Sequence, residues 1–293
     1  MKNDHIDIRG FAAILIITIL WGSNYSAIKI TNEGFSPIFT SFIRSVIASL
    51  LGIVYCLVIR QDLYHRGALF FHGLVVGVLF GLEFAFLYLG MLFTDSARAV
   101  ILIYLSPFVV AAGAHLFLGE RLSPLKWTGL VLAFGGLVAV FYGKPSHYNR
   151  LMLIGDILEI IAAFVWGATT LYIKKYCAGR MHPINTFLYQ LVFSVPVLFL
   201  CSCFIETQWI KDPGTLQFAS LAFQSVIVAF ISYLVWFKLI HDYPVARLSV
   251  FTFLTPVFGV LFAVLFQHEQ VTAGLLAGLF MVCGGIYVTN YTQ

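Results

Sequence analysis

The sequence has little charge: only 10% of its 293 residues are Asp, Glu, Lys or Arg, whereas soluble globular domains carry about 25%. The net charge of +4 is small and spread along the chain, so no basic block is present to bind nucleic acid. The five cysteines stand at no metal-ligand spacing and are typical of small apolar packing residues. No GxxxxGK[ST] stretch occurs, which excludes ATP hydrolysis through a P-loop.

Long apolar runs fill the sequence instead, and 60% of the residues are hydrophobic. Most runs exceed the ~18 residues that a helix needs to cross a bilayer. The first run is longer than the apolar core of a signal peptide and no clean cleavage site follows it, so we expect a retained first span. The runs predict an all-α integral membrane protein with ten transmembrane helices, at about 11–30, 37–59, 68–93, 97–118, 125–142, 151–173, 183–205, 215–239, 245–267 and 273–290.

The two halves of the chain repeat one pattern. Trp21-Gly22 returns 145 positions later as Trp166-Gly167, and Pro107 returns 149 positions later as Pro256. We therefore expect two five-helix repeats, over 11–142 and 151–290. Because five is an odd number of crossings, the second repeat must enter the membrane upside down relative to the first, as in transporters with inverted repeats.

The positively charged residues set the expected orientation. With the N-terminus inside, eleven Lys and Arg residues lie on the cytoplasmic side and five on the other. Cytoplasmic loops of membrane proteins carry such an excess. We expect a multi-pass protein of the plasma (inner) membrane with both termini in the cytoplasm.

Two charged residues lie inside predicted spans, where a charge is costly and usually faces a cavity or a partner. Glu83 is close to the middle of the third span, on the face away from Gly73, Gly77 and Gly81, which form a smooth seam for a neighbouring helix. Arg44 in the second span is within reach of it. Two interpretations stay open: a structural ion pair, or a direct role in binding substrate or a proton.

Other polar and aromatic residues complete the candidate site. In span one, Trp21 and Tyr25 share a helix face, and Asn24 adds polarity. In span six, Asp156, Glu159 and Trp166 belong to one stripe. Either the stripe lines an outward vestibule, or Asp156 lies in the outer interface and only Glu159 is partly buried. The predicted substrate-binding residues are Glu83, Arg44, Trp21, Tyr25, Asn24, Tyr88, Tyr104, Trp166 and Glu159.

Two further features have mainly structural interpretations. Pro107 and Pro256 are expected to kink spans four and nine, next to a cavity or as a packing feature. Glu120 and Glu269 closely precede the next helices, so capping and tight turns explain them better than transport does.

The combined motifs resemble the EamA-like family of the drug/metabolite transporter superfamily. The resemblance rests on Trp21-Gly22-Ser23-Asn24, Phe42-Ile43-Arg44, Pro107, the stretch 118–123 and Gly135-Gly136, with the same signs in the second half. One departure is His268-Glu269, where the family usually has Gly before Glu. The resemblance implies ten helices, a central cavity formed largely by spans one, three, four, six, eight and nine, and secondary transport of small organic solutes.

We therefore expect an exporter of amino acids or related metabolites that works by alternating access, without a cofactor and without enzymatic activity. Arg44 and Glu83 would meet the two charges of a zwitterion, and the aromatic residues would hold its apolar part. The partners are a small-molecule substrate and the lipid bilayer, and a coupling proton is left open. An uptake carrier or exchanger is the alternative. A membrane-embedded enzyme would need paired acid and base groups or metal ligands, which the sequence does not offer.

Overall fold

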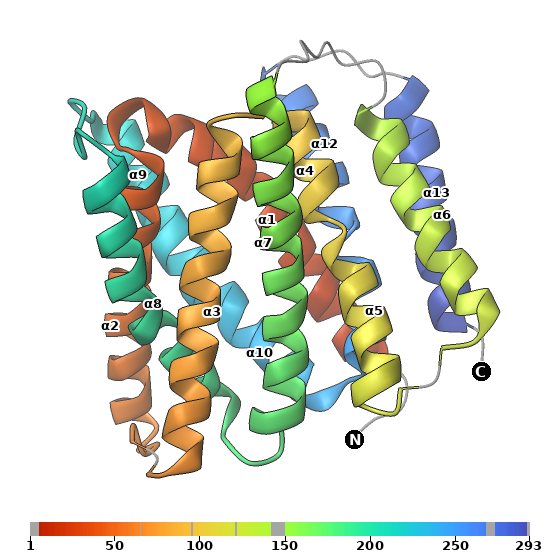
Figure 1. The fold of residues 1–293 in the computed structure, drawn as a ribbon, viewed down its shortest axis with the longest axis horizontal. Coiled ribbons are helices and arrows are strands. Elements are labelled where there is room, and N and C mark those ends of the chain that lie inside the picture. The colour runs from red at the N-terminus through yellow and green to blue at the C-terminus, as the bar shows by residue number, and fades with distance from the viewer. Residues whose placement is uncertain are drawn as a thin grey trace.

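The computed structural model describes residues 6–64, 66–94, 96–120, 122–141, 150–267 and 273–291, and this part of the chain is helical (Figure 1). Among these residues, nine helical segments are long and apolar enough to cross a membrane, and a shorter apolar stretch covers Leu276–Asn290. The bounds agree with the predicted spans to within a few residues, while the tenth crossing stays a prediction. The helices are α1 (Ile8–Gly34), α2 (Pro37–Val58), α3 (Ala68–Met91), α4 (Ser96–Ile103), α5 (Ser106–Phe117), α6 (Pro124–Phe141), α7 (Arg150–Tyr172), η1 (Ile173–Cys177), α8 (Pro183–Ile205), α9 (Thr215–Ala222), η2 (Phe223–Ser232), α10 (Tyr233–Asp242), α11 (Val245–Phe251), α12 (Leu254–Gln267) and α13 (Ala273–Tyr291).

The fourth and ninth predicted spans are each broken into two helices. Two residues separate α4 from α5, and two separate α11 from α12. Pro107 and Pro256 lie in the first turn of α5 and α12. Each proline lacks the amide hydrogen that would bond to the carbonyl four residues earlier, so the helix is interrupted there, as expected for a kink. The backbone stays helical across the interruption, since Leu105 and Thr252 keep right-handed helical φ and ψ angles.

The main contacts between helices join the two halves of the chain and come in matched pairs. Helix α3 packs on α7 and α8, and its counterpart in the second half, the segment α9–η2–α10, packs on α1 and α2. Helix α1 lies against α12, while α7 lies against α4 and α5. Counterparts also pair directly, α2 with α8 and α6 with α13, and the α6–α13 pair stands at one edge of the bundle (Figure 1). The halves thus interlock.

Glycine explains why the repeated Trp-Gly pair is present in both halves. A Cβ added at Gly22 would lie 2.6 Å from Cβ of Phe258 and 2.9 Å from the carbonyl oxygen of Thr255. A Cβ added at Gly167 would lie 2.6 Å from Cγ1 of Val109. Because Val109 and Phe258 are themselves 149 positions apart, the same close approach to a helix that follows a break occurs twice.

Helices α6 and α13 also meet through glycines. A Cβ at Gly129 would lie 2.8 Å from the carbonyl oxygen of Gly285, and one at Gly136 would lie 2.7 Å from that of Gly278. Each of these contacts is the counterpart of the other, since Gly129 and Gly278, like Gly136 and Gly285, are 149 positions apart. The two backbones therefore touch at a distance that only glycine permits.

The predicted glycine seam of α3 is confirmed. Gly73, Gly77 and Gly81 all face α8, where added Cβ atoms would collide with the chain at Tyr189, Phe193 or Val197. The seam places α3 tightly on the second half of the molecule and turns Glu83 away from α8.

The beginning of α1 and the end of α13 lie at the same face of the bundle, lower in Figure 1, which we call the terminal face. The connection between α10 and α11 is fixed there. The Tyr243 hydroxyl donates a hydrogen bond of 2.6 Å to Oδ1 of Asp7, which also caps α1 by accepting from the Gly10 amide. The Lys174 ammonium donates to the carbonyl oxygens of Ile240 and Tyr243 at 2.6 and 2.7 Å. A cation is thus placed at the negative end of the α10 dipole.

Glu120 fixes the other side of the same connection. Its two carboxylate oxygens accept hydrogen bonds from the amides of Val245 and Ala246, at 3.0 and 3.1 Å. The expected capping role is correct, but the capped helix is α11 in the other half and not the next helix in sequence. Sequence spacing alone cannot identify a cap between residues 125 positions apart. Glu269 lies outside the described residues.

The contact between α6 and α13 predicts a stability difference between two adjacent glycines. Gly136→Val should lower the free energy of unfolding by about 1–3 kcal/mol, the usual cost of overpacking, because its side chain would meet the backbone of Gly278. Gly135→Val is the matched control, since a Cβ there meets only the flexible end of Met281 at 3.2 Å. Thermal unfolding in detergent micelles measures both, and equal midpoints would contradict the contact.

Loss of the Glu120 carboxylate should destabilise the terminal face. In Glu120→Ala the buried amides of Val245 and Ala246 lose their acceptors, which costs about 1–3 kcal/mol. Glu33→Ala is the control, because Glu33 is exposed at the opposite face, where it accepts a hydrogen bond from Gln217. We expect the unfolding midpoint to fall for Glu120→Ala alone. A similar fall in both variants would argue against the cap.

The Glu120 carboxyl lies outside the membrane-spanning segments, and burial raises its pKa above the ordinary value of 4.5, against the lowering effect of the Ala246 and Val245 amides. An acid with a higher pKa in the folded state contributes stability below its unfolded pKa and loses it as the pH rises through the folded pKa. The difference in midpoint between wild type and Glu120→Ala should therefore shrink from acid toward neutral pH. A pH-independent difference would contradict this.

Candidate functional site

A cavity of about 660 Å³ lies between the two halves of the chain, within the usual range for small-molecule sites of about 300–1,000 Å³. Its wall reaches from Met91, Ala99 and Phe141, at the ends of α3, α4 and α6 opposite the terminal face, down to Ile240 in α10. Helices α1, α2, α3, α4, α6, α7, η1, α8, η2, α10 and α12 contribute to it. The expected lining spans are therefore all present, together with α2, α6 and α8.

Arg44 and Glu83 lie on the wall of this cavity, and each is less than 8% exposed. The Arg44 guanidinium stands 5.0 Å from the centre of the Phe84 ring, a cation–π contact. Arg44 and Glu83 interact electrostatically, yet they form no direct ion pair in the part of the chain that the structure describes. The two side chains therefore face the cavity without being locked to each other.

Tyrosines surround this charged pair. The Tyr233 phenol, in α10, interacts with both Arg44 and Glu83. The Tyr88 hydroxyl accepts a hydrogen bond of 2.8 Å from Ser41. Both rings line the cavity, so the charges are framed by aromatic side chains from both halves.

The two repeated tryptophans lie on different parts of the wall. Trp21 packs edge-on against Tyr233 and Trp236, with ring centres 5.6 and 5.3 Å apart, and its indole nitrogen donates to Ser232. Trp166 packs edge-on against Tyr104 at 5.7 Å. Their fixed indoles give the cavity rigid apolar surfaces.

Glu159 is the most enclosed charged residue of the site. It is 0% exposed, lines the cavity, and neither of its carboxyl oxygens has a hydrogen-bond partner among the described residues. Asp156, one turn earlier, differs: it forms an ion pair with Arg98 and accepts a hydrogen bond of 2.6 Å from Thr94. The stripe predicted on span six thus contains one satisfied carboxylate at the rim and one unsatisfied carboxyl at the cavity.

Three neutral polar groups are similarly unsatisfied. The side-chain oxygens of Asn24, Asn32 and Thr255 are buried without hydrogen-bond partners among the described residues, and all three residues line the cavity. Buried polar groups normally have partners, so these three oxygens are unusual. In the same part of the chain, no group of three or more His, Cys, Asp or Glu side chains is placed to hold a metal ion.

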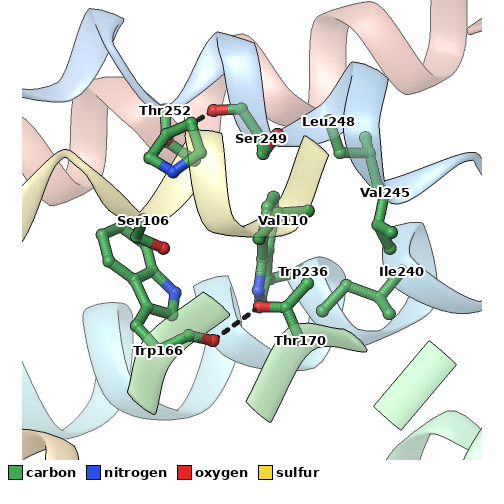
Figure 2. Close-up of a pocket in the computed structure, with 11 residues that line it drawn as sticks. Ser106, Val110, Trp166, Thr170, Trp236, Ile240, Val245, Leu248, Ser249 and Thr252 are labelled. Atoms are coloured by element: carbon green, nitrogen blue, oxygen red, sulfur yellow. Dashed lines mark hydrogen bonds between the residues drawn. The ribbon is translucent and has the colours of Figure 1, made fainter. Parts of the chain in front are cut away.

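A second, very small pocket of about 10 Å³ lies between this cavity and the terminal face. It shares Trp166, Thr170, Trp236 and Ile240 with the large cavity. Figure 2 shows Trp166 and Thr170 on one side of it and Ser249 and Thr252 on the other. The space corresponds to about one water molecule, so the path toward the terminal face is closed.

The residues that line the small pocket are repeat counterparts of residues that line the large cavity. Leu248, Ser249 and Thr252 stand 149 positions after Ala99, Val100 and Ile103. The same spacing relates Ser106, Pro107 and Val110 of the pocket to Thr255, Pro256 and Gly259 of the cavity. These positions of the large cavity therefore border open space, whereas their repeat counterparts at the small pocket are packed closely together.

Eight of the nine residues predicted from the sequence line the large cavity; the side chain of the ninth, Tyr25, lies outside the described part of the structure. The structure thus brings the predicted residues together, while their role in binding stays a prediction. The eight are Trp21, Asn24, Arg44, Glu83, Tyr88, Tyr104, Glu159 and Trp166.

Sequence reasoning missed several lining residues, including Gln190, Tyr233 and Trp236. The repeat held a signal for two of them. Tyr233 and Trp236 stand 149 positions after Phe84 and Leu87, which share the helix face next to Glu83. Applying the 149-residue spacing to the residues of that helix face would have predicted Tyr233 and Trp236 as lining residues.

Comparison with known proteins gives consistent results. The chain is 24% identical over 280 residues to the uncharacterized transporter YoaV of Bacillus subtilis, covering 95% of this chain and 96% of that one. It is 26% identical over 291 residues to a probable amino-acid metabolite efflux pump of Salmonella typhimurium (96% and 94% covered). A pump of the same name in Escherichia coli is 23% identical over 286 residues (94% and 93% covered).

A solved crystal structure shares the fold, with a TM-score of 0.83 at 18% sequence identity over 96% of both chains. The model of the EamA-like transporter family matches residues 8–142 and again residues 153–291. With nine apolar segments in the described residues, the chain is a multi-pass membrane protein. Since the family model matches both halves, the protein belongs to the EamA-like transporter family.

Proposed function

We propose that this protein is a secondary transporter that exports amino acids or related small metabolites by alternating access through the central cavity. The observation that carries the proposal is the pair of unequal spaces, about 660 and 10 Å³, lined by repeat counterparts. If the two halves exchange their conformations, the small pocket opens toward the terminal face and the large cavity closes. Transport then needs no further structural element.

This mechanism requires two five-helix repeats of opposite orientation, with ten crossings. The matched contacts between helices support it, as do the paired glycine contacts of α6 with α13 and of the Trp-Gly helices with α5 and α12. A rotation that exchanges the halves would convert each of these contacts into its counterpart. Such internal symmetry is the basis of alternating access in many secondary transporters.

The excess of Lys and Arg at the terminal face supports cytoplasmic termini in an inner membrane. In that orientation the large cavity opens outward, and Asp7, Glu120 and Lys174 hold the cytoplasmic side closed. The state described is then outward-open. Export would begin from the opposite state, with substrate entering through the region of the small pocket.

The wall chemistry suits a zwitterion with an apolar side chain. Arg44 can bind a carboxylate, an acidic side chain of the wall, Glu83 or Glu159, can bind an ammonium group, and the Trp21, Tyr88 and Tyr233 rings can contact the apolar part. The two relatives with pump in their names support amino-acid metabolites as the substrate class. The proposed role involves no bond making or breaking in the substrate.

Removing the Arg44 charge should affect only substrates that carry a carboxylate. In proteoliposomes, Arg44→Gln should raise the KM for L-phenylalanine counterflow about tenfold or more, since hydrogen bonds to charged groups contribute about 1.5–3 kcal/mol. Inhibition by 2-phenylethylamine, which lacks the carboxylate, should be unchanged. Arg66→Gln is the control, because Arg66 is exposed and outside the cavity. An equal loss of affinity for L-phenylalanine and for 2-phenylethylamine would contradict a carboxylate-binding role of Arg44.

Alternating access predicts unequal labelling of two counterpart positions. In a cysteine-free background, Val100→Cys should react quickly with a membrane-impermeant maleimide added outside intact cells, because Val100 lines the large cavity. Ser249→Cys, in the small pocket, should react slowly from either side of the membrane. Reversed or equal rates would overturn the outward-open assignment.

A further inference from the structure

Glu159 lies in the second repeat, and the matching position of the first repeat is the apolar Ile14. The mechanism described so far does not depend on Glu159. It lies in the middle of α7, on the cavity, with an exposure of 0%. Its carboxyl is turned toward Gly90 of α3: a Cβ on Gly90 would come within 2.7 Å of Oε1. The carboxyl therefore occupies a recess between α3 and α7 that exists only because residue 90 is glycine.

The charged groups around this recess do not neutralise a carboxylate. On α7 itself, Asp156 is acidic, and the guanidinium of Arg98 from α4 binds Asp156. From α3, the charged residue on the cavity wall is Glu83, which interacts with Arg44 of α2. From α5 and η1, His115 and Lys174 lie at the terminal face beside Glu120 and the end of α10. In the described residues neither Glu159 oxygen has a hydrogen-bond donor.

An ionised carboxylate in this position would lack both a counter-charge and hydrogen bonds, which is a strongly unfavourable state for a buried charge. A neutral carboxylic acid is compatible with the same surroundings. The empty cavity therefore favours a proton on Glu159. A solute that brings an ammonium group into the cavity supplies the missing positive charge and removes the need for that proton.

From this geometry we infer that Glu159 is a proton-binding site whose proton is exchanged for the ammonium group of the substrate, so that export is coupled to proton entry. This inference rests on the proposed function. In the outward-open state, substrate leaves and a proton from outside binds to a Glu159 oxygen. In the opposite state the proton is released to the cytoplasm as the ammonium group of the next substrate arrives.

The protonation of Glu159 can be tested without knowing the substrate. Infrared difference spectra of the purified protein at neutral pH, wild type minus Glu159→Gln, should contain the carbonyl stretch of a protonated carboxylic acid. Wild type minus Glu33→Gln should lack it, because Glu33 is exposed at the opposite face. If the first difference spectrum contains only carboxylate bands, the inference is overturned whatever the protein transports.

Coupling is tested in proteoliposomes with labelled L-phenylalanine. We expect an acid lumen to drive several-fold accumulation over the no-gradient level in wild type and Glu33→Gln, and none in Glu159→Gln. Glu159→Asp, which keeps a carboxyl that can bind the proton, should retain gradient-driven accumulation at a reduced level. Gradient-driven accumulation by Glu159→Gln would overturn the inference, as would wild-type accumulation that ignores the gradient; should Glu159→Gln unfold, Glu159→Ala takes its place. Absence of counterflow in wild type would instead count against the proposed function, and the infrared result alone would then decide the inference.

Discussion

Close backbone contact between the two halves is the constraint on which this architecture depends. At Gly22, Gly167, Gly129 and Gly136 an added Cβ would reach 2.9 Å or less from an atom of the other half. In lipid, where apolar side chains gain little from leaving the solvent, such close packing is a main source of helix association. The glycines therefore determine which helices become neighbours, and the broken helices and the cavity take their places around those contacts.

The arrangement of the helices is nearly the same in the two halves, but the polar residues of the cavity wall are not repeated. Ser232 stands at the position that matches Glu83, and Ile14 at the position that matches Glu159. Tryptophan, glycine and proline are duplicated, whereas Glu83 and Glu159 of the cavity wall are not. In the proposed mechanism this division separates two tasks: the repeated residues would shape the two access paths, and the unrepeated residues would bind the substrate.

The positions of the spans and of most site residues followed from the sequence because hydrophobic length and helical spacing are local properties. Eight predicted residues line one cavity. A charged or amide side chain in an apolar span is unfavourable against lipid and usually faces the interior of the bundle. The cap formed by Glu120 on α11, the recess at Gly90 and the π-helical segment η2 were not predictable in this way. Each depends on which distant helix lies alongside, and a pattern within one segment carries no information about that neighbour.

The interlocking of the halves has a consequence for how the chain is made. Because α3 packs mainly on α7 and α8, and α1 on α12, the first five helices enter the membrane before most of their neighbours have been synthesised. Their glycine surfaces then face lipid until the later helices leave the ribosome. The contacts that hold the bundle together can therefore form only once the second half of the chain has been inserted.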